Sequence, residues 1–220
     1  MVRMPHHRKM YSIMFRRYGD LGWWPAETRE EILIGTILTQ NTTWVNVTKC
    51  ISALKAKQLL TIRKIAKLDQ TKLEELIRSS GYFRQKANRL KTICARIISD
   101  FGGIESMDTM STDDISEYFS NLKGIGRETL DSILLYVFNR PVFVIDAYTL
   151  RILERVSSST IHPDKIRADV LRDLKSNIKD LKNYHAMFVE TGKNYCKKQP
   201  KCLECPLYQE CNYAIDLSSP

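Results

Sequence analysis

The chain has 220 residues, of which 43% are hydrophobic, and it carries a formal net charge of +9 at pH 7. This length allows one large domain or two small ones, with enough apolar residues for a core. No apolar run approaches the length of a membrane span, and the first residues lack the apolar segment of a secretory signal, which predicts an intracellular protein of the cytoplasm or nucleoid with no membrane partner. The positive charge favours an anionic partner, and DNA fits best.

A turn-rich segment and a helix open the regular pattern of the sequence. The segment over 19–25 holds Trp23 and Trp24, and apolar spacing predicts a helix directly after it, over 27–40, with Ile32, Leu33, Ile37 and Leu38 on its buried side. Polar residues at 39–44 then interrupt the apolar spacing before it resumes. The two indoles are therefore expected just ahead of a helix.

Residues 62–101 also show the apolar spacing of helices, with breaks at Asp69 and 79–82 and a stop at Gly102. A basic series along this stretch is typical of a solvated helix face, with a DNA-facing stripe as the alternative; it consists of Lys86, Arg89, Lys91 and Arg96. A short capped helix is expected at 112–119, and it leads into the next motif.

Two glycines predict a tight turn. Gly124 and Gly126 flank Ile125 just ahead of an apolar run with helical spacing, which is typical of a turn that opens a helix. Backbone amides at such a turn can hold a phosphate, because a helix N-terminus has unsatisfied N–H groups and a partial positive charge. An ordinary turn between two buried helices is the alternative.

Asp146 follows Gly126 by twenty residues and stands directly before a periodic segment over 147–153. An Asp at this position is expected to cap the next helix by accepting hydrogen bonds from its first amides. Its carboxylate would then be fixed at a helix end, near the predicted turn. Two further helices are predicted over 166–174 and 183–195, and the sequence shows no strand pattern, so the expected fold is all-α.

Four of the six cysteines cluster near the C-terminus in the pattern C-x5-C-x2-C-x5-C, formed by Cys196, Cys202, Cys205 and Cys211. Disulfides are not expected in a reducing compartment, and four thiolates within sixteen residues can ligate a [4Fe-4S] cluster. Zinc is the alternative, although structural zinc sites usually gather two close pairs, and only Cys202 and Cys205 form one. Cys50 and Cys94 are expected to be small buried hydrophobic residues.

The hairpin, Asp146 and the cysteine tail occur in an order that resembles the helix-hairpin-helix DNA glycosylases of the endonuclease III superfamily, from about Trp23 to Cys211. The first cysteine loop is one residue shorter than in the C-x6-C-x2-C-x5-C pattern of those relatives. The resemblance implies a two-lobed helical fold with four parts: an N-terminal segment over 1–25 that joins the cluster lobe, a barrel lobe over 26–135 with its hairpin at 122–127, a second lobe over 136–195 and a [4Fe-4S] loop over 196–211.

The resemblance also implies roles for individual residues. Asp146 would stabilise the oxocarbenium ion that forms when the N-glycosidic bond breaks, and it would activate water. Gln40 would enter the duplex and fill the space left by the extruded nucleotide; without the resemblance it would be an ordinary helix C-terminal residue. Further DNA contacts are implied for the hairpin and the cysteine loop through Lys123, Gly124, Ile125, Gly126, Arg127, Lys197 and Lys198.

The tryptophans resemble those of bacterial 3-methyladenine DNA glycosylases of the same superfamily. Trp23 and Trp44 would hold a cationic alkylated purine between them by stacking and cation–π attraction, worth about 0.5–2 kcal/mol for each good contact. Trp24 and Pro25 would shape the pocket wall, and Lys193 would lie in the pocket. The alternatives are core packing for the tryptophans, and a helix C-terminal or phosphate contact for Lys193.

Glu128 stands two residues after the second hairpin glycine, where bifunctional endonuclease III enzymes carry a nucleophilic lysine. A carboxylate cannot form a Schiff base, which favours a monofunctional glycosylase. The expected function is excision of an alkylated purine of the 3-methyladenine type from damaged double-stranded DNA by a monomer. The enzymatic alternatives are a glycosylase/lyase that uses another lysine and a thymine or uracil mismatch glycosylase. The non-enzymatic alternative is a helix-hairpin-helix module that only binds DNA.

Overall fold

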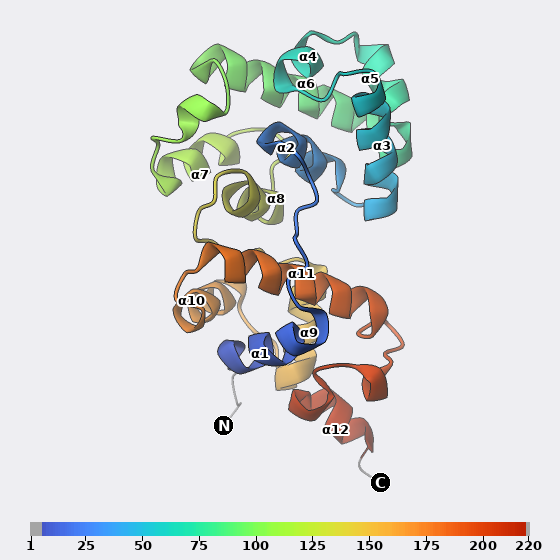
Figure 1. Ribbon diagram of the computed structural model, residues 1–220, viewed down its shortest axis with the longest axis vertical. Coiled ribbons are helices and arrows are strands. Elements are labelled where there is room, and N and C mark those ends of the chain that lie inside the picture. The colour runs from blue at the N-terminus through green and yellow to red at the C-terminus, as the bar shows by residue number, and fades with distance from the viewer. Residues whose placement is uncertain (1–5, 219–220) are drawn as a thin grey trace. The chain divides into compact units, whose positions relative to one another are not determined.

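The computed structural model describes residues 6–218, with side chains described through residue 217. Every regular element in this range is helical and no strand occurs in it, which confirms the predicted all-α fold (Figure 1). None of these helices combines the length and the apolar character needed to cross a lipid bilayer. Residues 1–5 of the predicted N-terminal segment over 1–25 lie outside the described range.

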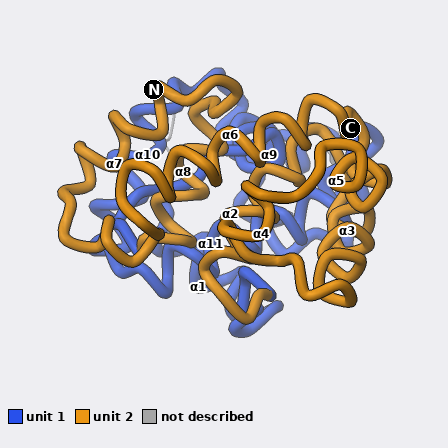
Figure 2. Tube along the Cα trace, turned by 90° about the horizontal axis from the view of Figure 1, so that it is seen from above, with its two compact units in different colours: residues 1–25, 139–220 blue, residues 26–138 orange. Residues whose placement is uncertain are grey.

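The chain forms two compact units (Figure 2). One unit, here termed the terminal unit, combines residues 1–25 with 139–220, and the other, termed the central unit, is residues 26–138. The division expected from the sequence fell after residue 135, whereas the division in the structure falls after residue 138. The chain therefore leaves the terminal unit once and returns to it once.

The central unit holds seven α-helices, two short 3-10 helices and one π-helix among the described residues. In chain order these are α2 (Arg29–Leu38), α3 (Trp44–Ala56), α4 (Ile62–Lys67), α5 (Gln70–Leu76), η1 (Arg78–Ser80), α6 (Phe83–Phe101), η2 (Glu105–Met107), α7 (Thr112–Ser120), α8 (Arg127–Ser132) and the π-helix η3 (Ile133–Val137).

Helix α2 runs through the core of the central unit, where it contacts α3, α6, α8 and η3. It begins at Arg29, later than predicted, because the Thr28 side chain caps it by accepting a hydrogen bond from the Glu31 amide. More of the helix surface is buried than the single side predicted from the sequence, since Ile34 is fully buried along with the expected Leu33. A helix that is covered on most of its sides fixes the position of the turn that follows it.

The breaks predicted around α5 and α6 are confirmed. Asp69 caps α5 through the Lys72 amide, and Gly102 ends α6 with a left-handed backbone at φ 76°. The expectation of a solvated face on α6 is wrong at Lys86, which is only 2% exposed. Its ammonium group can be buried because it donates hydrogen bonds to backbone carbonyls rather than to water.

The terminal unit is built on α11, which packs against α9 and α1. Its described elements are α1 (His7–Tyr18), α9 (Ala147–Ser157), α10 (Pro163–Asp173), α11 (Ile178–Asn194), the 3-10 helices η4 (Cys202–Glu204) and η5 (Tyr208–Glu210), and α12 (Asn212–Ser218). Helix α11 begins five residues before its predicted start at 183, because Asn177 caps it through the Asp180 amide.

Two contacts define the packing of the terminal unit. Gly192 of α11 lies so close to Tyr148 of α9 that a Cβ atom at position 192 would clash with the tyrosine ring. At the other end of α11, Nδ1 of His7 lies 3.2 Å from the hydroxyl of Tyr184. The first helix of the chain is thereby held against a helix that lies more than 160 residues later in the sequence.

Candidate functional site

Asp146 is the N-cap of α9, as predicted. Its Oδ1 atom accepts a hydrogen bond of 2.7 Å from the backbone amide of Thr149, and its own backbone is extended. This bond satisfies a donor that the first turn of a helix would otherwise leave without a partner. The Asp146 side chain is 12% exposed. The carboxylate is therefore held in one orientation at the end of a helix, with part of its surface open to a ligand.

His185 of α11 lies next to this carboxylate, with its Nε2 atom 3.7 Å from Oδ2 of Asp146. Burial acts to raise the pKa of Asp146, but the interaction with His185 and the Thr149 amide outweigh it, so that the pKa is lowered below its usual value. Asp146 is thus a carboxylate at neutral pH. Sequence reasoning missed His185, since a single histidine inside a mostly apolar helix carries no local signal of a functional role.

Trp23 and Trp24 lie side by side in the terminal unit. Their ring centroids are 5.5 Å apart, with the planes at 51° to one another. The ammonium group of Lys193 lies 5.6 Å from the centroid of the Trp23 ring and 3.3 Å from Oε1 of Glu190. Both indoles are half-buried, and Pro25 after them is exposed. The structure therefore brings three of the predicted pocket residues together: Trp23, Trp24 and Lys193.

A cavity opens beside Trp23 in the terminal unit, lined by Asp20, Gly22, Asn139, Ile178, Lys179, Lys182 and Asn183. Lys182 donates a hydrogen bond of 2.6 Å to Oδ1 of Asn139, and burial lowers the pKa of its amine. Asp146 does not line this cavity.

Gln40 lies in the central unit, in the turn after α2, and its side chain is engaged within the protein. Its Nε2 atom donates to the carbonyl oxygen of Gly124 at 3.0 Å and to the hydroxyl of Thr129 at 2.9 Å. Its Oε1 atom accepts a hydrogen bond from Arg89. The predicted wedge residue and the predicted hairpin are thus joined directly by hydrogen bonds.

The hairpin has the geometry of a tight turn that opens a helix. Gly124 has a φ of 92°, which favours glycine, and a Cβ atom there would clash with the guanidinium of Arg89. Gly126 is the N-cap of α8. The flanking Lys123 and Arg127 are exposed, and Arg127 also pairs with the buried Asp131 at 3.0 Å. The hairpin therefore presents backbone and basic side chains at one turn.

The remaining predicted residues of the central unit lie at helix starts. Trp44 is the first residue of α3 and is half-buried. Glu128 lies in the first turn of α8, and its side chain is exposed. No lysine occupies the position that carries the nucleophile in the resembled bifunctional enzymes.

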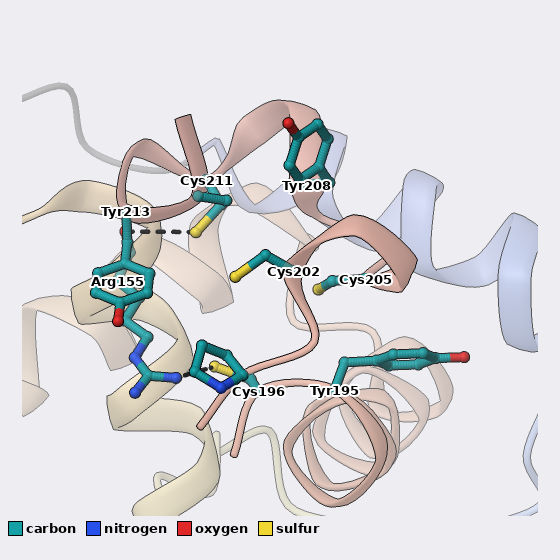
Figure 3. A pocket seen from close by; sticks show the side chains of 10 residues that line it. Arg155, Tyr195, Cys196, Cys202, Cys205, Tyr208, Cys211 and Tyr213 are labelled. Carbon is teal, nitrogen blue, oxygen red and sulfur yellow. Dashed lines mark hydrogen bonds between the residues drawn. The ribbon is translucent and has the colours of Figure 1, made fainter. Parts of the chain in front are cut away.

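The four clustered cysteines line one cavity of the terminal unit, and their sulfur atoms face a shared space (Figure 3). Arg155, in the last turn of α9, donates a hydrogen bond of 3.3 Å to Sγ of Cys196, and its backbone carbonyl lies 3.5 Å from Sγ of Cys211. Arg151 donates to the carbonyl of Cys196 at 2.8 Å. Helix α9 thus carries Asp146 at its start and contacts with the cysteine loop at its end.

The donor set of this cavity is four thiols. Burial, together with the neighbouring cysteines, raises the pKa of Cys205 to about 11, so four thiolates there need a positive centre. Within residues 6–218, no three His, Cys, Asp or Glu side chains are gathered as the ligands of a single metal ion. Thiolates of this kind can ligate an iron–sulfur cluster or a zinc ion.

Two basic residues project from the cysteine loop. Lys197 and Lys198 follow Cys196 directly and are exposed, and the carbonyl of Lys197 accepts a hydrogen bond of 2.8 Å from Arg155. Cys50 and Cys94, by contrast, are fully buried in the central unit, as predicted. Burial raises the pKa of Cys94 to about 12, so this thiol stays protonated.

The family model of the HhH-GPD superfamily base excision DNA repair proteins matches residues 34–176 of this chain. The chain therefore belongs to the HhH-GPD superfamily of base excision DNA repair proteins. The match spans the hairpin and Asp146, which lie in different units of the structure. The protein is a DNA N-glycosylase, an enzyme that hydrolyses the bond between a base and its sugar.

Two relatives agree with this assignment. A protein of Methanocaldococcus jannaschii, named as a proposed DNA repair glycosylase, is 41% identical over 92% of this chain and 94% of its own length. Endonuclease III of Thermotoga maritima is 30% identical over 83% of this chain and 82% of its own length.

Two solved structures share the fold. The 3-methyladenine DNA glycosylase of Helicobacter pylori, bound to 1,N6-ethenoadenine, is 26% identical with a TM-score of 0.76, and the match covers 85% of this chain and 97% of that one. An endonuclease III in a non-covalent complex with DNA has a TM-score of 0.81 at 22% identity, with 99% of both chains covered. At that identity, the second likeness is one of fold alone.

Proposed function

We propose that this enzyme is a monofunctional glycosylase that extrudes an alkylated purine of the 3-methyladenine type from double-stranded DNA and excises it. The observation that carries the proposal is the state of Asp146, a carboxylate fixed by the Thr149 amide and His185 with its pKa lowered. An anion held in place before the reaction can stabilise positive charge that develops on the sugar, because it does not need to reorient.

When the base is cationic, the protein does not need to protonate the leaving group. The bond between C1′ and the base nitrogen breaks with its electron pair passing to the base, which leaves as a neutral purine without prior protonation. Asp146 stabilises the resulting oxocarbenium ion and takes a proton from the water that attacks C1′. The exposed Glu128 offers no amine for a Schiff base, which supports hydrolysis rather than lyase chemistry.

The aromatic residues support the choice of substrate. Trp23 is half-buried next to Trp24 and Lys193, and its indole would stack on an extruded base. The indole of Trp44 would also serve base stacking, and Pro25 would border the pocket. The relative from Helicobacter pylori, a 3-methyladenine glycosylase bound to an ethenoadenine, supports a modified purine.

The hairpin, Gln40 and the cysteine loop would hold the duplex. Exposed Lys123 and Arg127 beside the turn at Gly124–Gly126 suit a phosphate, and Gln40 would fill the gap in the stack. Cys196, Cys202, Cys205 and Cys211 would ligate a [4Fe-4S] cluster, which supplies structure by pinning the loop. Lys197 and Lys198 would then meet the phosphate backbone at little entropic cost. We expect the enzyme to be a monomer that acts inside the cell on damaged double-stranded DNA.

The test is release of bases from methylated duplex DNA by the purified protein, with the released bases identified by mass spectrometry. We expect 3-methyladenine among the products and a loss of roughly 100-fold or more in the Asp146→Asn variant, with DNA affinity retained. Release of thymine or uracil from mismatches instead, or a covalent adduct with abasic DNA after borohydride reduction, would overturn the proposal. Retained base release in the Asp146→Asn variant would overturn the role of this residue.

A further inference from the structure

The ammonium group of Lys86 lies inside the central unit, where it joins two segments of backbone. The side chain is 2% exposed. Its Nζ atom donates to the carbonyl oxygen of Leu38 at 2.8 Å and to that of Ser80 at 2.7 Å. Leu38 is the last residue of α2 and Ser80 is the last residue of η1, so Lys86 ties the ends of two helical segments together.

The residue before Ser80 makes a second connection. The Ser79 hydroxyl donates to the carbonyl oxygen of Asn46 at 3.1 Å and also lies 3.0 Å from Sγ of Cys50. Asn46 and Cys50 belong to α3, and η1 packs against this helix. A continuous polar link therefore runs from the end of α2 to the start of α3 through Lys86, Ser80 and Ser79. We call this link the brace.

The brace spans the turn over 39–43, since it is attached at Leu38 before this turn and at Asn46, in the first turn of α3, after it. This turn carries Gln40, and Trp44 begins the helix that follows it. We propose that Lys86 is a positioning residue for DNA binding and base extrusion, because its brace fixes the distance between the two ends of the turn that presents Gln40 and Trp44.

The choice of a lysine at this buried position supports a geometric role. Burial of an ammonium group is unfavourable, and an apolar side chain of similar volume is often tolerated equally well in a core. Burial lowers the pKa of Lys86 to about 8, which reflects that unfavourable environment. What an apolar side chain cannot supply is a donor to the carbonyl of Leu38 and to that of Ser80. The same two hydrogen bonds engage the Nζ atom of Lys86, which a lyase would need as a free nucleophile.

Lys91 provides a matched control on the same helix. Its amine also donates to a backbone carbonyl, that of Leu68, but this carbonyl lies between α4 and α5 and not next to the turn over 39–43. The test variants are therefore Lys86→Met and Lys91→Met, studied in the full-length protein. Ser79→Ala removes the second attachment of the brace and should act in the same direction as Lys86→Met.

The first measurement is hydrogen exchange of the free protein, which depends on no substrate. We expect amides in the peptide covering 39–46 to exchange at least tenfold faster in Lys86→Met, with other core peptides unchanged, and no such change in Lys91→Met. Unchanged exchange at 39–46 in Lys86→Met would overturn the proposal. General acceleration across the central unit would also overturn it, because Lys86 would then stabilise the whole unit rather than the turn.

The second measurement tests the consequence for DNA and rests on the proposed role of Gln40. A duplex with 2-aminopurine opposite a tetrahydrofuran abasic site reports insertion of a side chain into the stack through its fluorescence. We expect a signal with wild-type protein, its loss in Gln40→Ala and in Lys86→Met at equal DNA occupancy, and no further loss in the double variant. A full signal in Lys86→Met would overturn the positioning role. If wild-type protein and Gln40→Ala gave the same signal, the assignment of Gln40 would fail, while the exchange data would still decide on the brace.

Discussion

The Nε2 atom of His185 lies 3.7 Å from Oδ2 of Asp146, and both side chains are largely buried in the terminal unit. Asp146 lies at the start of α9 and His185 lies in the middle of α11, so the packing of two helices sets this distance. The pair explains how a carboxylate can remain charged in a buried setting. A substitution of His185 should therefore change the pKa of Asp146 while the carboxylate itself stays in place.

Replacement of His185 by Ala should make base excision more sensitive to acid. Burial raises the pKa of Asp146, and His185 is the main group that opposes this effect. Without it the pKa should rise, and the active carboxylate should be lost at a higher pH than in the wild type. Single-turnover rates measured across the acidic range would show the shift of the acidic limb. A profile that falls at the same pH in both proteins would contradict the assigned interaction.

Acid should destabilise the terminal unit through His7. Burial lowers the pKa of this histidine from 6.5 to about 4, although Asp173 and Asp169 act to raise it. Because the folded pKa is depressed, the unfolded state binds more protons between these values, and stability falls as the pH drops below 6.5. The loss should approach about 3 kcal/mol near pH 4. Urea unfolding of wild-type protein and His7→Asn at neutral and acidic pH measures it, and an equal acid sensitivity of the two proteins would refute this origin.

Gly192→Ala should destabilise the protein by about 1–3 kcal/mol. The added methyl group would clash with the ring of Tyr148, and the close contact between α9 and α11 leaves little room for the backbone to move. Denaturant unfolding gives the difference in free energy. The variant Gly192→Ala with Tyr148→Ala serves as the control, since removal of the ring should recover part of the loss. Normal stability of Gly192→Ala would show that the two helices are less tightly packed.

Removal of the charges of Lys197 and Lys198 should weaken DNA binding equally for all sequences. Each phosphate contact contributes about 0.9 to the slope of the logarithm of affinity against the logarithm of salt concentration, so the double alanine variant should lower this slope by about 2. The exposed Lys165 of α10 is the control, and its replacement by alanine should leave the slope unchanged. A slope that stays the same in the double variant would place these lysines outside the DNA interface.

Local features of the site could be predicted from the sequence because each depends on a few neighbouring residues. The turn at Gly124 and the N-cap at Asp146 follow from the conformational freedom of glycine and from the capping preference of aspartate. The gathering of the four cysteines around one cavity follows from their short spacing. The all-α fold itself was readable from apolar periodicity, with errors of a few residues at the helix starts.

Features that depend on long-range packing could not be read in this way. Lys86 stands among basic residues that have the spacing of a solvated face, and only the folded central unit shows that its amine meets two carbonyls. His185 meets Asp146 only because α9 and α11 lie together. The engagement of Gln40 with Gly124 likewise joins residues 84 positions apart, and no local pattern indicates it.

The placement of α1 has a consequence for the order in which the chain folds during synthesis. Met10 and Met14 are buried in the terminal unit, where α1 contacts α10 and α11. These partners leave the ribosome only after the whole of 26–138 has been made, so the earliest helix must wait while later segments assemble. The central unit can therefore fold first. The terminal unit, with the cysteine loop, can fold only after the C-terminal part of the chain has been made.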